Sequence, residues 1–150
     1  MSRKIDIETV PVSAGSRYPE PFNAPCQDKI RRRLAKAAGF TRIGINLLEL
    51  LPGAWSSQRH WHSQAEEFVC VIEGEVVLVT EGCEELLHPG DCAAFRPGDA
   101  DGHHLQNRSD QLARVLEIGS GFMPDDETYY PDIDMHASAS GYFHKDGKPY

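Results

Sequence analysis

Apolar residues along this chain gather in short runs that turn residues separate. The first long run spans residues 40–51 and ends at Pro52-Gly53. A second run, residues 67–72, is rich in β-branched and aromatic residues and ends at Glu73-Gly74. Runs of this length, bounded by Gly and Pro, are typical of β-strands. The same pattern predicts further strands at 75–80, 83–87 and 112–118, so we expect an all-β fold.

The first forty residues carry a different pattern. Residues 4–10 alternate with period two before Pro11, which suits an edge strand, and prolines make 13–25 a predicted loop. From Cys26 to Ala38, Ile30 and Leu34 stand four residues apart and Gly39 follows, which predicts one short helix. Five basic residues are then more simply a solvated helix face than an anion-binding patch: Lys29, Arg31, Arg32, Arg33 and Lys36.

Residues 122–150 are rich in Pro, Asp, Tyr and Gly and show no helical period. We therefore expect an irregular C-terminal tail and no helix-turn-helix. Its aromatic residues are too numerous to stay solvated. They are predicted to pack on their own or a neighbouring chain, and they are Tyr129, Tyr130, Tyr142, Phe143 and Tyr150.

Composition and charge narrow the classes of partner. The 150 residues suffice for one domain, and a formal net charge of -8 argues against a general nucleic-acid-binding protein. The first ten residues are too polar for a signal peptide, and no apolar run reaches the length of a membrane span. We therefore expect a cytoplasmic protein that binds a small molecule, with no membrane or nucleic-acid partner. The cysteines lack Cys-x-x-Cys spacing and are predicted to be small buried hydrophobes: Cys26, Cys70, Cys83 and Cys92.

Two histidines and a carboxylate stand at the start of the second apolar run. In an extended strand, residues two apart point to the same face, so His60 and His62 project together. Glu66 and Glu67 follow, and strand alternation alone does not choose between them. Two imidazoles and a carboxylate suit Zn, Fe, Mn, Ni or Cu. A His-x-His motif by itself is also common in solvated loops.

A second segment, residues 90–107, strengthens the metal hypothesis. It contains a short strand, the Pro97-Gly98 turn and a new strand that carries further histidines. The two segments together resemble the paired motifs of the cupin superfamily, over about residues 41–119. The matching positions are Gly53, His60, His62, Glu67 and Gly74 in the first motif, and Gly90, Pro97, Gly98, His103 and Asn107 in the second.

The match departs from the usual pattern in two places. Six residues rather than five separate Gly53 from His60, and the loop that follows Pro97-Gly98 is about two residues longer than usual. The spacing to Gly74 selects Glu67 over Glu66. The longer loop leaves His104 as a rival to His103.

The resemblance implies a double-stranded β-helix, or jelly-roll barrel, over residues 40–121. Residues 1–39 would supply a strand, a loop and a short helix packed on the barrel, and 122–150 a C-terminal extension. It also implies one divalent transition metal ion (Zn, Fe, Mn, Ni or Cu) and no organic cofactor. The implied ligands are His60, His62, Glu67 and His103.

The sequence is similar to small bacterial cupins described as sugar-phosphate-isomerase-like. The expected function is that of a metal-dependent isomerase or lyase acting on a sugar or organic acid. Two alternatives stay open: a non-catalytic sensor of a small molecule, and an Fe-dependent dioxygenase. The resemblance also implies a homodimer.

No catalytic residue follows from the sequence. Several residues near the motifs are candidates for proton transfer or for holding an anionic substrate: Glu66, Asp99 and Asp101 as bases, and Arg59 and Arg96 as anion ligands.

Overall fold

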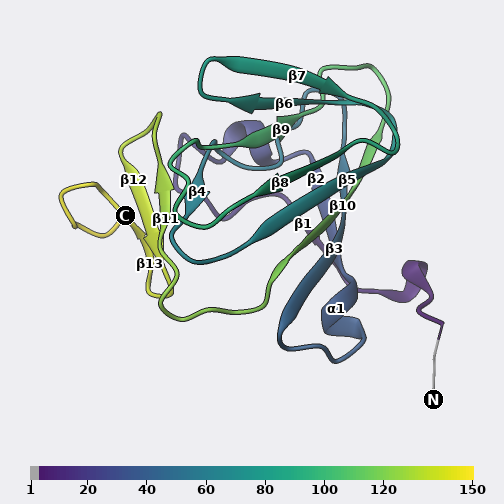
Figure 1. The fold of residues 1–150 in the computed structure, drawn as a ribbon, viewed down its shortest axis with the longest axis horizontal. Coiled ribbons are helices and arrows are strands. Elements are labelled where there is room, and N and C mark those ends of the chain that lie inside the picture. Colours follow the sequence, from purple (N-terminus) through teal and green to yellow (C-terminus); the bar gives the residue numbers. More distant parts are fainter. Residues whose placement is uncertain (1–3) are drawn as a thin grey trace.

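Short antiparallel strands form the framework of the computed structural model, which describes residues 4–150 (Figure 1). The largest sheet has six strands in the order β1-β2-β3-β10-β5-β8. Their bounds are β1 Val12–Ala14, β2 Lys29–Arg33, β3 Ile43–Leu50, β10 Ala113–Ser120, β5 Glu67–Glu73 and β8 Cys92–Phe95. The runs predicted at 40–51, 67–72 and 112–118 thus correspond to β3, β5 and β10.

Two smaller sheets complete the structure. One has the order β7-β6-β9, with β6 Val76–Thr80, β7 Cys83–Leu87 and β9 His104–Gln106, and it lies at the top of Figure 1. The other has the order β13-β12-β11-β4, with β4 Trp61–His62, β11 Thr128–Tyr130, β12 Met135–Ser138 and β13 Gly141–Phe143. No helix among the described residues is long and apolar enough to cross a membrane.

The core lies between the six-stranded and three-stranded sheets. Alternate residues of β3, β5 and β10 point inward, and Leu48, Val71 and Val115 among them are fully buried. They pack in one cluster with Val76 and Leu78 of β6. Removing these side chains from water supplies the main driving force for closing the barrel. The all-β jelly-roll architecture is therefore confirmed.

Segment 4–10 was wrongly predicted as an edge strand. Residues Ile7–Thr9 form a 3-10 helix, because Asp6 caps it by accepting a hydrogen bond from the Glu8 amide at 3.2 Å. Such local side-chain bonds compete with strand pairing. The first strand is instead β1, beyond Pro11.

The predicted helix from Cys26 to Ala38 is also wrong in most of its length. A 3-10 turn covers Ala24–Cys26, β2 follows at Lys29–Arg33, and only Leu34–Ala37 form the helix α1. Strand β2 is bonded to β1 on one side and β3 on the other. These two ladders outweigh the weak helical spacing. The basic residues therefore lie on a strand rather than on a helix face.

The C-terminal segment is not the irregular tail that the sequence suggested. It forms β11, β12 and β13, and β11 pairs with β4. The aromatic residues pack on their own chain, since Tyr129 stacks on Trp61 with ring centroids 4.5 Å apart. The proposed boundaries at residues 39 and 121 stay predictions, and residues 1–3 of the first range lie outside the described residues.

The cysteines only partly match the expected burial. Cys26 is buried, Cys70 is half-buried, and Cys83 and Cys92 are exposed. All four are free thiols. The two exposed cysteines correct the prediction of buried hydrophobes.

Candidate metal centre

The two histidine-bearing segments are joined through their backbones. The His60 amide donates to the His103 carbonyl at 3.1 Å, and the His103 amide donates to the His60 carbonyl at 2.8 Å. This pairing continues the ladder that places residues 54–56 along β9, with Ser56 donating to the Leu105 carbonyl. Residues far apart in sequence are thereby held side by side.

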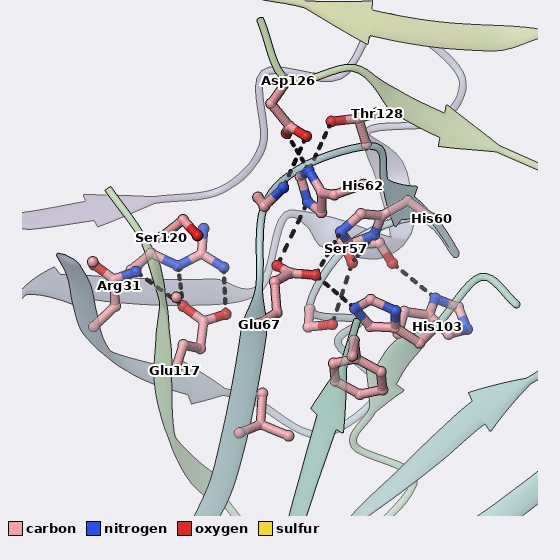
Figure 2. Close-up of a pocket in the computed structure, with 18 of the residues that line it drawn as sticks. Arg31, Ser57, His60, His62, Glu67, His103, Glu117, Ser120, Asp126 and Thr128 are labelled. Atoms are coloured by element: carbon pink, nitrogen blue, oxygen red, sulfur yellow. Dashed lines mark hydrogen bonds and ion pairs between the residues drawn. The ribbon is translucent and has the colours of Figure 1, made fainter. Parts of the chain in front are cut away.

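Glu67 brings a carboxylate to these histidines from the first position of β5. It points inward, on the same face as Val69 and Val71 of the core. Figure 2 shows its two oxygens between the three imidazole rings. His103 Nε2 lies 2.8 Å from Oε2, His60 Nε2 lies 3.7 Å from the same oxygen, and His62 Nε2 lies 3.6 Å from Oε1. Donor atoms of His60, His62 and Glu67 all lie within 4.8 Å of one another.

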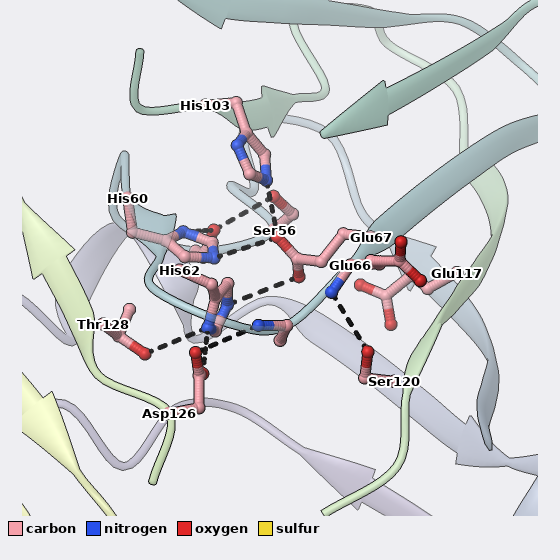
Figure 3. A network of polar contacts seen from close by, with 12 residues as sticks. Ser56, His60, His62, Glu66, Glu67, His103, Glu117, Ser120, Asp126 and Thr128 are labelled. Carbon is pink, nitrogen blue, oxygen red and sulfur yellow. Dashed lines mark hydrogen bonds and ion pairs between the residues drawn. The ribbon is translucent and has the colours of Figure 1, made fainter. Parts of the chain in front are cut away.

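Two of the rings are held by acceptors on the side away from Glu67. His60 Nδ1 lies 2.9 Å from the Gln58 carbonyl oxygen, and His62 Nδ1 lies 2.6 Å from Asp126 Oδ2 (Figure 3). A carbonyl or carboxylate oxygen accepts only, so each Nδ1 carries a hydrogen and each Nε2 keeps a lone pair in the neutral ring. This outer arrangement is usual around metal-bound histidines. The residues therefore fit a transition metal ion.

His103 is oriented differently. Its ring stacks on Phe95 with the ring centroids 3.4 Å apart, and its buried Nδ1 has no hydrogen-bond partner among the described residues. Phe95 lies opposite Glu67 in the β5–β8 ladder. The stacking therefore positions Nε2 of His103 on the carboxylate.

The cluster perturbs the ionisation of its members when no ion is present. Burial opposes ionisation of Glu67, but hydrogen bonds from His103, His60 and His62 outweigh it and hold the Glu67 pKa well below its usual range. Burial also disfavours a charged His62, yet Glu67 and Asp126 raise the His62 pKa to about 9. For His103, burial dominates and lowers the pKa. The carboxylate is thus ionised, and the neighbouring His62 carries a positive charge at neutral pH.

The two other candidates from the second motif have structural contacts. His104 points away from Glu67, its Nδ1 lies 2.8 Å from the Ser57 carbonyl oxygen, and its ring packs edge-on against Trp55. Since a carbonyl oxygen only accepts, that Nδ1 is the donor. Asn107 is buried and donates to the carbonyls of Leu50 and Gln111. Of the two neighbouring histidines, the structure places His103 and not His104 beside Glu67.

A cavity of about 690 Å³ opens onto this cluster, which is a usual size for a small-molecule site. Its walls include Tyr18, Tyr130 and Phe95, together with the exposed Glu66. Asp99 and Asp101 line a second cavity of about 230 Å³ that also reaches His62, Glu67 and His103. Of the three predicted bases, Glu66 alone faces the larger cavity.

The predicted anion-binding arginines do not line the larger cavity. Arg59 is 8% exposed and donates to both carboxylate oxygens of Asp132 at 2.7 Å and to Glu81 at 2.7 Å. It therefore joins the C-terminal segment to the barrel. Arg96 lines only the smaller cavity.

Sequence reasoning missed the residues that distant segments bring to the site. Asp126 and Thr128 contact His62 Nδ1 from the C-terminal segment, and Arg31 of β2 pairs with Glu117 of β10 on the cavity wall (Figure 2). For β2, residues 31–33 are all basic, so the sequence shows no period-two alternation that would have predicted a strand. For Asp126, the sequence contains no signal either.

Comparisons with known proteins agree with this architecture. The cupin domain family matches residues 46–119. A crystal structure from Silicibacter pomeroyi, described as a sugar phosphate isomerase from a cupin superfamily, is 42% identical with a TM-score of 0.92, over 99% of this chain and 96% of that one.

Two further solved structures share the fold alone. A putative sugar phosphate isomerase from Acidithiobacillus ferrooxidans is 24% identical with a TM-score of 0.75, over 86% of this chain and 82% of that one. A polyketide cyclase from Streptomyces resistomycificus is 21% identical with a TM-score of 0.68, over 84% of each chain. No curated protein matches the chain. The whole-length likeness to the Silicibacter pomeroyi protein, together with the barrel and both motifs, shows that this chain belongs to the cupin superfamily.

Proposed function

We propose that His60, His62, Glu67 and His103 hold one divalent transition metal ion, and that the protein uses it as an isomerase or lyase on a small oxygenated substrate. The observation that carries the proposal is the orientation of the imidazoles. Acceptors hold Nδ1 of His60 and His62, so that both Nε2 atoms face Glu67. Three neutral imidazoles and one carboxylate leave a divalent ion with net positive charge.

When bound, such an ion polarises a substrate carbonyl oxygen. The protein's own residues supply the rest of the chemistry. Asp126 holds a proton on His62 Nδ1, and Phe95 fixes the plane of His103. Glu66, on the cavity wall, is placed to exchange protons with a bound ligand. A sugar-type substrate is supported by the 42% identical relative that is described as a sugar phosphate isomerase.

The test is a turnover screen of sugar phosphates, hydroxy acids and diketones with Zn, Ni, Mn and Fe forms of the protein, with and without oxygen. We expect turnover that does not consume oxygen and that Glu67→Gln abolishes. His88→Ala, an exposed histidine outside both cavities, should keep it. Turnover only with Fe and stoichiometric oxygen consumption would instead establish the dioxygenase. Tight ligand binding without turnover would establish the sensor.

We also propose that two chains pair as a homodimer in the cytoplasm. The outer face of the six-stranded sheet carries large apolar side chains that are exposed to solvent, including Phe68 and Ile72 of β5 and Ile43 of β3. Exposed apolar patches often mark an association surface. Light scattering should give the mass of a dimer, and Ile72→Lys should shift it toward the monomer. A wild-type monomer would contradict the pairing.

A further inference from the structure

Strand β2 directs a row of basic side chains into the larger cavity. Lys29, Arg31 and Arg33 alternate along the strand, and their ladder partners on β3 are Leu50, Leu48 and Asn46. Leu48 and Leu50 belong to the buried core, so these three basic residues share the inward face. All three line the cavity that contains the histidine cluster.

Of the basic residues in this row, Arg31 has a carboxylate partner and Lys29 has none among the described residues. Arg31 donates to both oxygens of Glu117, at 2.7 Å and 2.8 Å, so that these two charges offset each other. Lys29 is 7% exposed, and its ammonium donates to the Ser56 carbonyl at 2.6 Å. Among residues 4–150, no carboxylate lies within ion-pair distance of Lys29. A buried ammonium with a single neutral acceptor is unfavourable, and it has two further hydrogens to donate.

Apart from the exposed Glu66, the acidic groups that line the cavity are already paired with other residues. Glu67 faces the three histidines, Asp126 bonds to His62, and Glu117 bonds to Arg31. Lys29 is therefore the buried cation in this cavity that an incoming ligand can neutralise. Burial and the nearby Arg31 lower the pKa of Lys29, and an anionic ligand would favour its charged form.

The surroundings of Lys29 connect it to the histidine cluster. Ser56, which accepts its hydrogen bond, precedes Ser57, whose Oγ lies 3.2 Å from His60 Nδ1. On the other side, the Lys29 ammonium lies 5.9 Å from the centre of the Tyr18 ring, and Tyr18 packs edge-on against Tyr130. Tyr130 in turn lies 5.9 Å from the His60 ring. A tyrosine-lined wall thus runs from Lys29 to the cluster.

We propose that Lys29 binds an oxyanion of the substrate, a phosphate or carboxylate group, while oxygens at the other end of the same molecule face the histidine cluster. The inference rests on the proposed function only for the end of the ligand that faces the histidine cluster. Lys29 then sets specificity, because a buried cation selects anionic molecules over neutral sugars. Arg33 is exposed at the cavity and adds a positive potential that attracts such ligands.

The test measures anion binding by metal-free protein, so that the metal site cannot supply the affinity. Inorganic phosphate and malonate are titrated by calorimetry into wild type, Lys29→Met and Lys29→Arg. We expect Lys29→Met to weaken binding by about tenfold to a hundredfold, and Lys29→Arg to retain most of it. Lys36→Met, an exposed lysine on α1, is the matched control and should leave binding unchanged.

A second pair of measurements separates this proposal from the metal proposal and from a structural role. Metal content of Lys29→Met should equal that of wild type. Its thermal stability should hold or rise without anions, because the variant removes an unbalanced buried charge. Loss of phosphate binding alone would identify a phosphate ester, and loss of malonate binding alone a carboxylate. Unchanged binding of both anions, or lower stability with unchanged binding, would overturn the proposal. If Lys29→Met does not fold, Lys29→Gln keeps a donor for Ser56 and decides the same question.

Discussion

The two ring nitrogens of His62 have different neighbours, and this difference prepares the ring for a metal. Nδ1 lies 2.6 Å from Asp126 Oδ2, while Nε2 lies 3.6 Å from Glu67 Oε1. In the neutral ring the hydrogen stays on Nδ1, because the Asp126 carboxylate accepts it. Nε2 then offers its lone pair toward the cluster. Asp126 is thus a positioning residue for the proposed centre.

Asp126→Asn is predicted to move the hydrogen of the neutral His62 ring from Nδ1 to Nε2, with little change in side-chain shape. Oδ1 of Asp126 accepts from the amides of Gln64 and Ala65, so the asparagine oxygen should stay there and its NH₂ should face His62. The hydrogen of His62 then moves to Nε2. We expect metal affinity to fall by about tenfold to a hundredfold, measured by competition with a chromogenic chelator. Asp125→Asn, an exposed neighbour, is the control. Equal affinities in both variants would show that Asp126 does not orient His62.

The predicted ligands and the missed residues differ in how far apart they lie in sequence. His60, His62 and Glu67 lie within eight positions of one another, so strand geometry and motif spacing identified them, and the more distant His103 was identified through the second motif of the family. Asp126 and Lys29 reach the site only through the pairing of β11 with β4 and of β2 with β3. Pairing between distant strands depends on the packing of the whole core, so local sequence patterns do not predict it. That is why the contacts of these two residues required the structure.

Strand β2 is an element whose secondary structure could not be predicted from local sequence. Ile30 and Leu34 stand four apart as in a helix, and Gly39 does end the short helix α1 as predicted, with a φ of 76°. The strand nevertheless forms, because free edges of β1 and β3 are available to it on both sides. Tertiary pairing overrides a weak helical spacing. The alternating basic residues then face the cavity instead of solvent.

The turn between β5 and β6 depends on a glycine for two reasons. Gly74 has a φ of 72°, and a Cβ there would lie 2.5 Å from the Leu112 carbonyl oxygen. Gly82, in the next turn, has a φ of 67° but open space around it. Gly82→Ala should therefore cost about 1–2 kcal/mol for the left-handed backbone alone. Gly74→Ala should cost more, since the backbone of β10 must also move. Urea unfolding of both variants measures the difference, and equal costs would contradict this account.

For the whole molecule, Arg59 is one of the polar links between the barrel and the C-terminal segment, through its hydrogen bonds to Asp132. Its hydrogen bonds lower the pKa of Asp132 below the ordinary 3.8. A lowered carboxyl pKa stabilises the fold above about pH 4, and this stabilisation is lost as the pH falls through the lowered value. Asp132→Asn should therefore reduce the urea midpoint at pH 7, and its difference from wild type should shrink at pH 3. Asp28→Asn, an exposed carboxylate, is the control. A pH-independent difference would contradict the ion pair as the cause.

The sequence predicted the central strands of the barrel but not the C-terminal strands that pack on it. Apolar runs and turn residues located β3, β5, β6, β7 and β10, because short strands with Gly or Pro at their ends have a local signature. The C-terminal strands β11–β13 lack such runs. They are stabilised instead by pairing with β4 and by packing such as Tyr129 on Trp61. Those contacts join segments that are far apart in the sequence, so no local pattern predicts them.

The central claim is that four side chains hold one metal ion, and elemental analysis of protein purified without added metal tests it most directly. We expect about one transition metal per chain in wild type and in the exposed-histidine variant His88→Ala. The content should fall sharply in His60→Ala, His62→Ala, Glu67→Ala and His103→Ala. His104→Ala should keep most of the metal, since His104 bonds to the Ser57 carbonyl instead. A metal-free wild type, or metal lost from His104→Ala but retained by His103→Ala, would contradict the account.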